Sequence, residues 1–156
     1  MEEIEYSIHP PTPFIEQSWQ ALLPDWNTPV LSVFVLLQRS PVMLCQSTGD
    51  VETAKQRLRD RSIHLLLPLV ERLHDNHYEA TLFDPRTGLP YCSHLSGIPL
   101  NDVAVIQSVL GYPRHQYGQC YCLVHPTWGS SVYPTIILSS TPPLILQAVA
   151  QCILGE

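Results

Sequence analysis

The sequence predicts an α+β fold in which a mixed β-sheet is flanked by helices. Residues 30–37 (VLSVFVLL) and 132–138 (VYPTIIL) are rich in the β-branched residues that are typical of strands. Between them, residues 51–73 carry Leu, Val and Ala side chains at helical spacing. Because further strand-like and helix-like segments follow in irregular alternation, we expect one mixed sheet with helices packed on it.

The composition indicates one folded domain over residues 1–156. Hydrophobic residues make up 45% of the chain and charged residues 14%, a balance typical of globular proteins. The formal charge of −6 argues against nucleic acid as a partner, since phosphate binding depends on clustered Lys and Arg. The acidic start and the short apolar runs predict neither a secretory signal nor a membrane span, so we expect a soluble, cytoplasmic protein.

The N-terminal half is predicted to contain a surface segment, a strand and a long helix. Residues 1–29 are expected to be irregular, or to form a short helix over residues 14–23, and to pack on the domain. Residues 30–37 are apolar on both faces, which predicts a strand in the middle of the sheet. Residues 47–50 (STGD) offer a cap for the long helix, and Pro68 is expected to kink or break it.

The next segment is predicted to contain a strand, a turn and a short helix. Residues 78–83 have strand composition, and residues 83–90 (FDPRTGLP) contain the Asp-Pro and Thr-Gly pairs of a tight turn. Asn101 and Gly111 stand where the N-cap and C-cap of a short helix belong.

Two strands and a helix are expected to complete the fold. Residues 119–125 (QCYCLVH) and 132–138 have strand composition and are joined around Trp128-Gly129, and Pro134 places the second strand at an edge or a bulge. A last helix is expected to follow Thr141-Pro142. Its predicted apolar face includes Leu144, Ala148 and Cys152.

Cysteine is the residue type that offers chemistry here. The odd number of cysteines, in a chain large enough to fold without disulfides, predicts reduced thiols in a reducing compartment. Cys120 and Cys122 face the same side of a predicted strand, with Cβ atoms about 6.5–7 Å apart, too far for a bond between them without distortion. The full set is Cys45, Cys92, Cys120, Cys122 and Cys152.

The residues near these thiols leave two interpretations open. One of the two thiols, as a thiolate beside His115 or His125, is a candidate nucleophile or soft metal ligand. Alternatively both cysteines are small core side chains, and His125 is a hydrogen-bonded structural residue beside Trp128. The chain lacks a glycine-rich phosphate loop, a Gly-x-Ser-x-Gly elbow and a His-Glu-x-x-His helix, so the sequence does not favour an enzyme.

Several segments together resemble a known family. They are LLPDW at residues 22–26, FDPRTGLP at residues 83–90, LGY at residues 110–112 and GQCYCLVHPTWG at residues 118–129. In this order they resemble the cobalamin trafficking proteins of the CblD type, named for the type D form of combined methylmalonic aciduria and homocystinuria. The resemblance extends over nearly the whole chain and is strongest between Tyr78 and Thr141.

The resemblance implies a nitroreductase-like scaffold that has lost flavin chemistry and serves as an adaptor. In the family, a cysteine thiolate ligates the cobalt of cobalamin (vitamin B12) that is presented by a CblC-type processing protein. By this likeness the partner is such a protein or a cobalamin-dependent enzyme. Cys120 and Cys122 become candidate cobalt ligands, and His125, Trp128 and Gly129 become the surrounding cofactor site.

The chain departs from the family at the ligand itself. Gln119 stands at the position of the family's first cysteine, Cys120 matches the second, and Cys122 is an addition. On a strand, residues 119 and 120 would point to opposite sides. Either Cys120 takes over after a local bulge, or cobalt ligation is lost while partner binding remains. The alternative functions are a thiol- or flavin-dependent oxidoreductase on the same scaffold and a ligand-free interaction domain.

Overall fold

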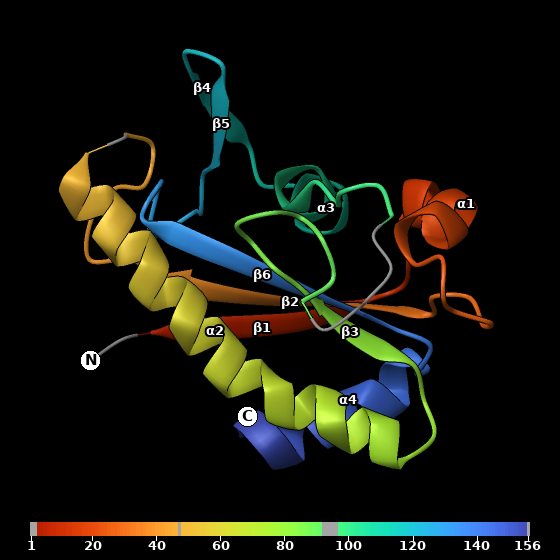
Figure 1. The fold of residues 1–156 in the computed structure, drawn as a ribbon. Coiled ribbons are helices and arrows are strands. Elements are labelled where there is room, and N and C mark those ends of the chain that lie inside the picture. The colour runs from red at the N-terminus through yellow and green to blue at the C-terminus, as the bar shows by residue number, and fades with distance from the viewer. Residues whose placement is uncertain (1–2, 47, 92–96, 156) are drawn as a thin grey trace.

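A four-stranded sheet with helices on both faces forms the body of the molecule, and a two-stranded hairpin stands away from it (Figure 1). The computed structural model describes residues 3–46, 48–91 and 97–155. The main sheet has the strand order β1-β2-β6-β3, and its three strand pairs are all antiparallel. The α+β class is therefore confirmed, whereas the expected mixed sheet is wrong.

The strands of the main sheet differ in how well the sequence predicts them. β2 (Ser32–Arg39) lies between β1 and β6, and all of its residues except the last are buried, as its apolar composition predicts. β3 (Ala80–Phe83) and β6 (Val132–Ser139) also lie where strands are expected. β1 (Ile4–His9) corrects the expectation for residues 1–29, because this short edge strand forms by pairing with β2 and not through a strong propensity of its own.

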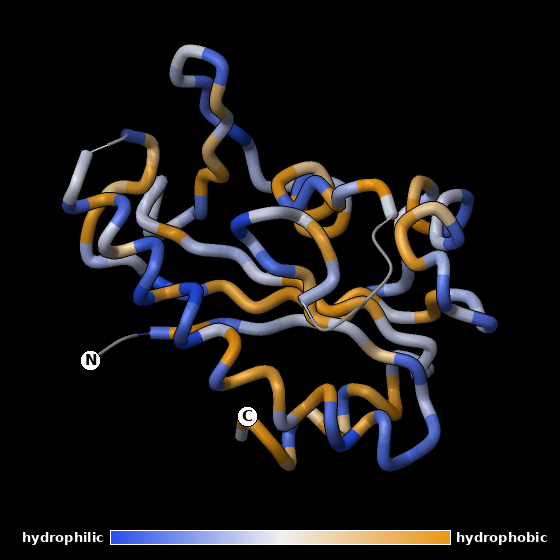
Figure 2. The backbone as a smooth tube through the Cα atoms, viewed as in Figure 1, coloured by the Kyte–Doolittle hydropathy of each residue, from blue (hydrophilic) through white to orange (hydrophobic). Residues whose placement is uncertain are grey.

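Two helices cover each face of the main sheet. α1 (Pro13–Leu22) and α3 (Asp102–Leu110) pack with the odd-numbered residues of β2, whereas α2 (Gly49–Asp75) and α4 (Pro143–Leu154) pack with its even-numbered residues. Figure 2 shows the hydrophobic residues concentrated in the central strands and along the inner sides of the helices. The molecule is thus a three-layer sandwich with one apolar layer on each side of the sheet.

The helices begin and end at the residues that local chemistry indicates. The side chains of Thr12, Thr48 and Asn101 each accept a hydrogen bond from a backbone N–H in the first turn of their helix. Gly111 ends α3 in the left-handed conformation, with φ 73°. Ser47 of the predicted cap lies outside the described residues.

Two expectations about helices need correction. α2 runs through Pro68 as one helix, so the break offered as an alternative to a kink does not occur; Pro68 and the residue four positions before it lie on the exposed face, where water can bind the carbonyl that the proline leaves free. In α4, Leu146 and Ala150 are buried, whereas Leu144 is 86% exposed and Cys152 is exposed. Both stripes of α4 are apolar, so only packing against α2 and β1 selects between them.

β6 accommodates Pro134 although it is an inner strand. Backbone groups alternate along a strand, and Ser140 donates its N–H to Glu79 on the β3 side, so Pro134 also directs its nitrogen to that side. β3 pairs only with the second half of β6, from Ile136 onward. β6 is therefore an inner strand over its second half. Its first half, which contains Pro134, has no described strand on the β3 side and is an edge there.

The hairpin consists of β4 (Arg114–Tyr117) and β5 (Cys120–Leu123). β5 lies where a strand is expected, but it pairs with β4 and not with β6. β4 was not expected, because its sequence RHQY is polar and all four residues are exposed. Such a strand buries no face and exists through its partner alone.

Candidate functional site

A cavity of about 670 Å³ opens at the end of the sheet where β3 stops. The unpaired half of β6 contributes Val132, Tyr133 and Pro134 to its floor. One wall comes from the first turns of α2, another from the hairpin, and the turn after β3 closes a third side. The short β3 therefore creates the cavity, because a longer strand would continue along β6 and fill it.

Cys120 lines this cavity and is an exposed, free thiol. Gly118 and Gln119 form the two-residue turn of the hairpin, and Gly118 has φ 60°, which favours glycine. Tyr117 pairs with Cys120, so the thiol is on the first residue after the turn. The expected opposition of residues 119 and 120 on a strand is wrong, since Gln119 belongs to the turn. The hypothesis that Cys120 is a core side chain is also wrong.

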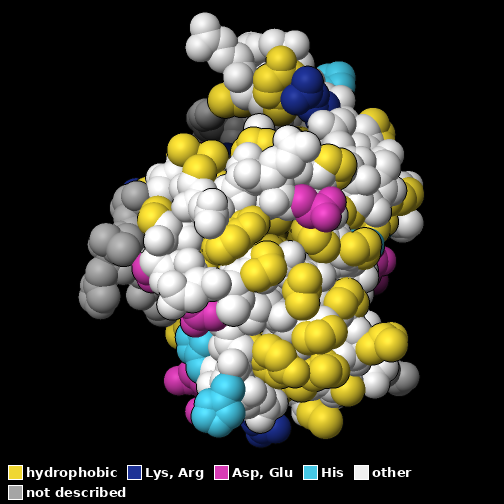
Figure 3. Space-filling model, turned by 90° about the vertical axis from the view of Figure 1, so that its right-hand side faces the viewer, with side chains coloured by type: hydrophobic (Ala, Val, Ile, Leu, Met, Phe, Trp, Pro, Cys, Tyr) yellow, Lys and Arg dark blue, Asp and Glu magenta, His cyan; other side chains and the backbone are white. Residues whose placement is uncertain are grey.

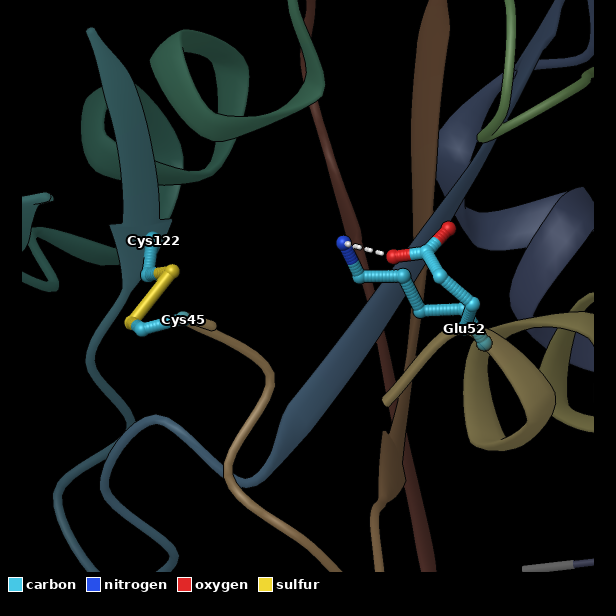
Figure 4. The surroundings of a disulfide bond; sticks show 4 residues. Cys45, Glu52 and Cys122 are labelled. Carbon is cyan, nitrogen blue, oxygen red and sulfur yellow. Dashed lines mark ion pairs between the residues drawn. A yellow bond between two sulfur atoms is a disulfide. The ribbon is translucent and has the colours of Figure 1, made fainter. Parts of the chain in front are cut away.

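Cys122 forms a disulfide with Cys45, which lies in the loop between β2 and α2 (Figure 4). The two Cα atoms are 5.6 Å apart, a normal separation for a disulfide. The expectation of reduced thiols is therefore wrong for these two residues, and Cys122 has no thiolate to offer a metal in this state. Cys152 is free, and Cys92 lies outside the described residues.

His125 is a structural residue. It is 4% exposed, its Nδ1 accepts hydrogen bonds from the backbone N–H groups of Thr127 and Trp128, and its Nε2 lies 2.8 Å from Oε1 of Glu5. Because Nδ1 is an acceptor, Nε2 carries the hydrogen and donates a hydrogen bond to the carboxylate of Glu5. Both ring nitrogens are thus engaged, which confirms the structural interpretation and leaves His125 no lone pair for a metal.

Trp128 and Gly129 complete the turn that His125 holds. The indole stacks on the imidazole with ring centroids 4.1 Å apart, and Gly129, at φ 60°, exchanges backbone hydrogen bonds with His125. Of the described residues that line the cavity, none belongs to this group of three. His125, Trp128 and Gly129 thus support the chain between β5 and β6, and the cofactor site that the resemblance implies for them stays a prediction.

An ion pair joins the turn after β3 to α2. Arg59 donates from Nε and Nη2 to the two carboxylate oxygens of Asp84, at 2.8 and 2.7 Å. The hydrogen bonds from Arg59 lower the pKa of Asp84 and outweigh its burial, and Asp84 raises the pKa of Arg59 in return. Arg59 therefore has an internal role, although it lies in a basic stretch of α2 over residues 55–61.

Asp102 and Tyr133 form the titratable part of the cavity, where Tyr133 is buried and Asp102 is partly exposed to solvent. Burial raises the pKa of Asp102 to about 6, against hydrogen bonds from its own N–H and that of Val103. Burial also raises the pKa of Tyr133, and the charge of Asp102 adds to that effect. The sequence gives Asp102 no distinguishing neighbour, since it follows the cap Asn101 like any first-turn acidic residue, so only tertiary burial identifies it.

The opposite wall of the cavity carries a second, more exposed ion pair. Lys55 lies 3.7 Å from Glu52 one helical turn before it. Figure 4 shows this pair on one side and the disulfide on the other, and all four residues line the cavity. The cavity therefore combines charges of both signs on α2 with sulfur atoms on the hairpin side.

Exposed apolar side chains occur in two regions. Around the hairpin these are Met43, Tyr117 and Tyr121, and on the face that carries α1 and the start of α4 (Figure 3) they include Phe14, Leu144 and Ile145. On the hairpin, the guanidinium of Arg114 lies 4.1 Å above the ring of Tyr121. Aromatic and Arg side chains of this kind are enriched in protein interfaces.

No protein-family model and no curated protein matches this sequence. Within the described ranges, there is no group of three or more His, Cys, Asp or Glu side chains that could hold a metal ion. None of the helices in this part of the chain is long and apolar enough to cross a membrane. The site itself must therefore carry the functional argument.

Proposed function

We propose that the protein is a cobalamin trafficking adaptor that offers the Cys120 thiolate to the cobalt of a cobalamin held by a partner protein. The observation that carries this proposal is the position of Cys120, an exposed free thiol directly after the tight turn of a hairpin that stands away from the body. The resemblance to CblD-type proteins indicates cobalamin as the bound molecule, and the projecting hairpin would let Cys120 reach it.

The chemistry of the ligand fits such a presentation. A thiolate is a soft ligand suited to a transition metal. Cys120, on a narrow and projecting hairpin, would be the residue that offers this thiolate to cobalt in a partner's pocket. No second ligand from this chain is needed, which agrees with the engagement of His125 and Cys122 elsewhere.

The surroundings of Cys120 suit a protein partner. Tyr117 pairs across the hairpin with Cys120 and shares its face, and Tyr121 lies on the opposite face. Both rings are exposed and can contribute contact area when the hairpin enters a partner. A CblC-type processing protein or a cobalamin-dependent enzyme is the partner that the resemblance indicates.

The experiment is an ultraviolet–visible titration of cob(II)alamin with the protein, alone and together with a CblC-type partner. We expect the cobalt absorption bands to shift with the wild-type protein and to stay unshifted with Cys120→Ser. Cys152→Ser is the matched control, because it removes the other free thiol of the described residues, on α4. A shift that persists in Cys120→Ser would overturn thiolate ligation by this residue. No shift with any protein would favour the ligand-free interaction domain.

A thiol-dependent oxidoreductase is the second candidate, because Cys120 and the Cys45–Cys122 disulfide line the same cavity. In this reaction the Cys120 thiolate would attack one sulfur of a substrate disulfide and release the other as a thiolate. A second thiol would then resolve the mixed disulfide. Repeated turnover of hydroxyethyl disulfide with a thiol reductant, lost in Cys120→Ser, would support this function. A rate equal to the uncatalysed reaction would exclude it.

A further inference from the structure

The Cys45–Cys122 disulfide joins two parts of the chain that are 77 residues apart. Cys45 lies in the loop that leads from β2 into α2, and Cys122 lies in the middle of β5. The bond therefore connects the hairpin directly to the body (Figure 4), and both of its cysteines line the cavity.

The other attachments of the hairpin are at its base. Leu123 is buried in the core, and the N–H of Val124 donates to the carbonyl of Pro113, where the two strands leave the body. For residues 114–122, the hydrogen bonds between described residues stay within the hairpin. Cys122 pairs with His115 and directly precedes Leu123, so the covalent tie lies in the strand pair next to the base, and the hairpin beyond it has neither of these attachments.

The tie is accessible to a reductant. Both cysteines line the 670 Å³ cavity, which is open to solvent, and Cys122 is only partly buried. Thiol–disulfide exchange requires that a thiolate reach one sulfur in line with the bond that breaks. A disulfide in the wall of an open cavity meets this requirement, whereas one inside the apolar layers would not.

We propose that the Cys45–Cys122 disulfide is a redox latch that a dithiol reductant, either a small dithiol or a dithiol protein, opens. One thiolate of the reductant attacks a disulfide sulfur, and its second thiol displaces the mixed disulfide. The reductant is oxidised to a disulfide, and Cys45 and Cys122 each gain one electron and one proton. The hairpin then pivots about its base, and the cavity loses the wall that the hairpin forms.

The latch controls the position of Cys120. In the oxidised state the hairpin is held on the body with Cys120 at the cavity, and in the reduced state the same thiol is free to sample a wide range of positions. Its consequence for cobalt rests on the proposed function, because a ligand held in place loses less conformational freedom on binding. The release of the hairpin itself does not depend on cobalamin.

The experiment is hydrogen–deuterium exchange, resolved by peptide, on the full-length protein before and after treatment with dithiothreitol. The thiol count in denaturant should rise by two on reduction, and amides of residues 114–122 should exchange at least about tenfold faster. Amides in β2, which is central in the sheet, exchange through global unfolding, so the comparison uses exchange times at which β2 is still protected in both states. An unchanged thiol count, or equal hairpin exchange in both states, would overturn the latch.

Variants separate the latch from the reductant and from the proposed function. Cys45→Ser and Cys122→Ser should show fast hairpin exchange without dithiothreitol, while Cys152→Ser should behave like the wild type. If cobalamin binding depends on Cys120, its affinity should fall about tenfold on reduction of the latch. Fast exchange in the reduced state with equal cobalamin affinity in both states would keep the latch and contradict only its effect on cobalt binding, whereas a cobalt shift that persists in Cys120→Ser would contradict the proposed function and leave the latch.

Discussion

Asp102 is the residue whose protonation should be most visible in the stability of the protein. Its pKa rises from 3.8 to about 6 because burial disfavours the charged carboxylate, which corresponds to about 3 kcal/mol. The folded state therefore holds this proton more tightly than the unfolded state. The contribution of the protonated Asp102 to the free energy of unfolding is therefore complete below about pH 4 and is lost as the pH rises through about 6.

We expect Asp102→Asn to remove this pH dependence. We measure the free energy of unfolding in urea at pH 4 and at pH 7. From pH 4 to pH 7, this free energy should fall by up to about 3 kcal/mol more in the wild type than in the variant. Asp50→Asn is the matched control, since Asp50 is also a first-turn carboxylate but is exposed, on α2. Equal pH dependence of the wild type and Asp102→Asn would contradict a raised pKa of Asp102.

The ion pair of Arg59 and Asp84 should be worth more than a surface pair. Their side chains are only 19% and 11% exposed, and Arg59 donates two hydrogen bonds to the carboxylate. We expect Arg59→Met to lower the free energy of unfolding by about 2–3 kcal/mol, because it leaves the carboxylate of Asp84 without its ion-pair partner, and Asp84→Asn to cost less, because Arg59 keeps Asp60 at 3.7 Å. The double variant should lose less than the sum of the two.

The lowered pKa of Asp84 adds a pH dependence of opposite sign to that of Asp102. The pair stabilises the protein above the ordinary carboxyl pKa, near pH 4, and this stabilisation is lost as the pH falls through the lowered pKa. Urea unfolding of the four proteins in the cycle provides the test. Additive single losses at neutral pH would mean that the two side chains do not stabilise each other.

At the scale of elements, the turn between β5 and β6 depends on His125. His125→Ala should cost about 2–3 kcal/mol, because the buried N–H of Trp128 and the partly buried N–H of Thr127 lose their acceptor. His115→Ala, on the exposed strand β4, is the matched control and should change stability by less than about 0.5 kcal/mol. Trp128 stacks on His125, so tryptophan fluorescence reports the change. Equal losses in both variants would contradict the structural role.

The elements that could be predicted are those with local chemistry. Thr48, Asn101 and Gly111 mark helix ends through bonds and dihedrals within a few residues, so the sequence contains all that is needed to place them. β2 is announced by its uninterrupted apolar run. β1 and β4 are short, partly or wholly exposed strands whose existence depends on a partner strand, and no local pattern reveals the partner.

The candidate site follows the same division. Cys120 could be singled out because it stands beside a second cysteine and within a segment that resembles a family. The pairing of Cys122 with Cys45 could not, since it joins residues 77 apart that only the arrangement of β5 beside the loop before α2 brings together. The raised pKa of Asp102 likewise depends on the tertiary packing around the cavity and not on its neighbours in the sequence.

At the scale of the molecule, the disulfide should also contribute to global stability. A crosslink over 77 residues restricts the unfolded chain and is expected to stabilise the fold by about 4 kcal/mol. In urea, the reduced protein should unfold at a lower midpoint and with a steeper dependence on urea, because its unfolded chain exposes more surface. Cys122→Ser should match the reduced protein, and Cys152→Ser should respond to reduction as the wild type does. Equal urea midpoints of the oxidised and the reduced protein would mean that the disulfide does not stabilise the three-layer body and that the hairpin moves independently of it. Hydrogen exchange of the hairpin alone would then report the redox state.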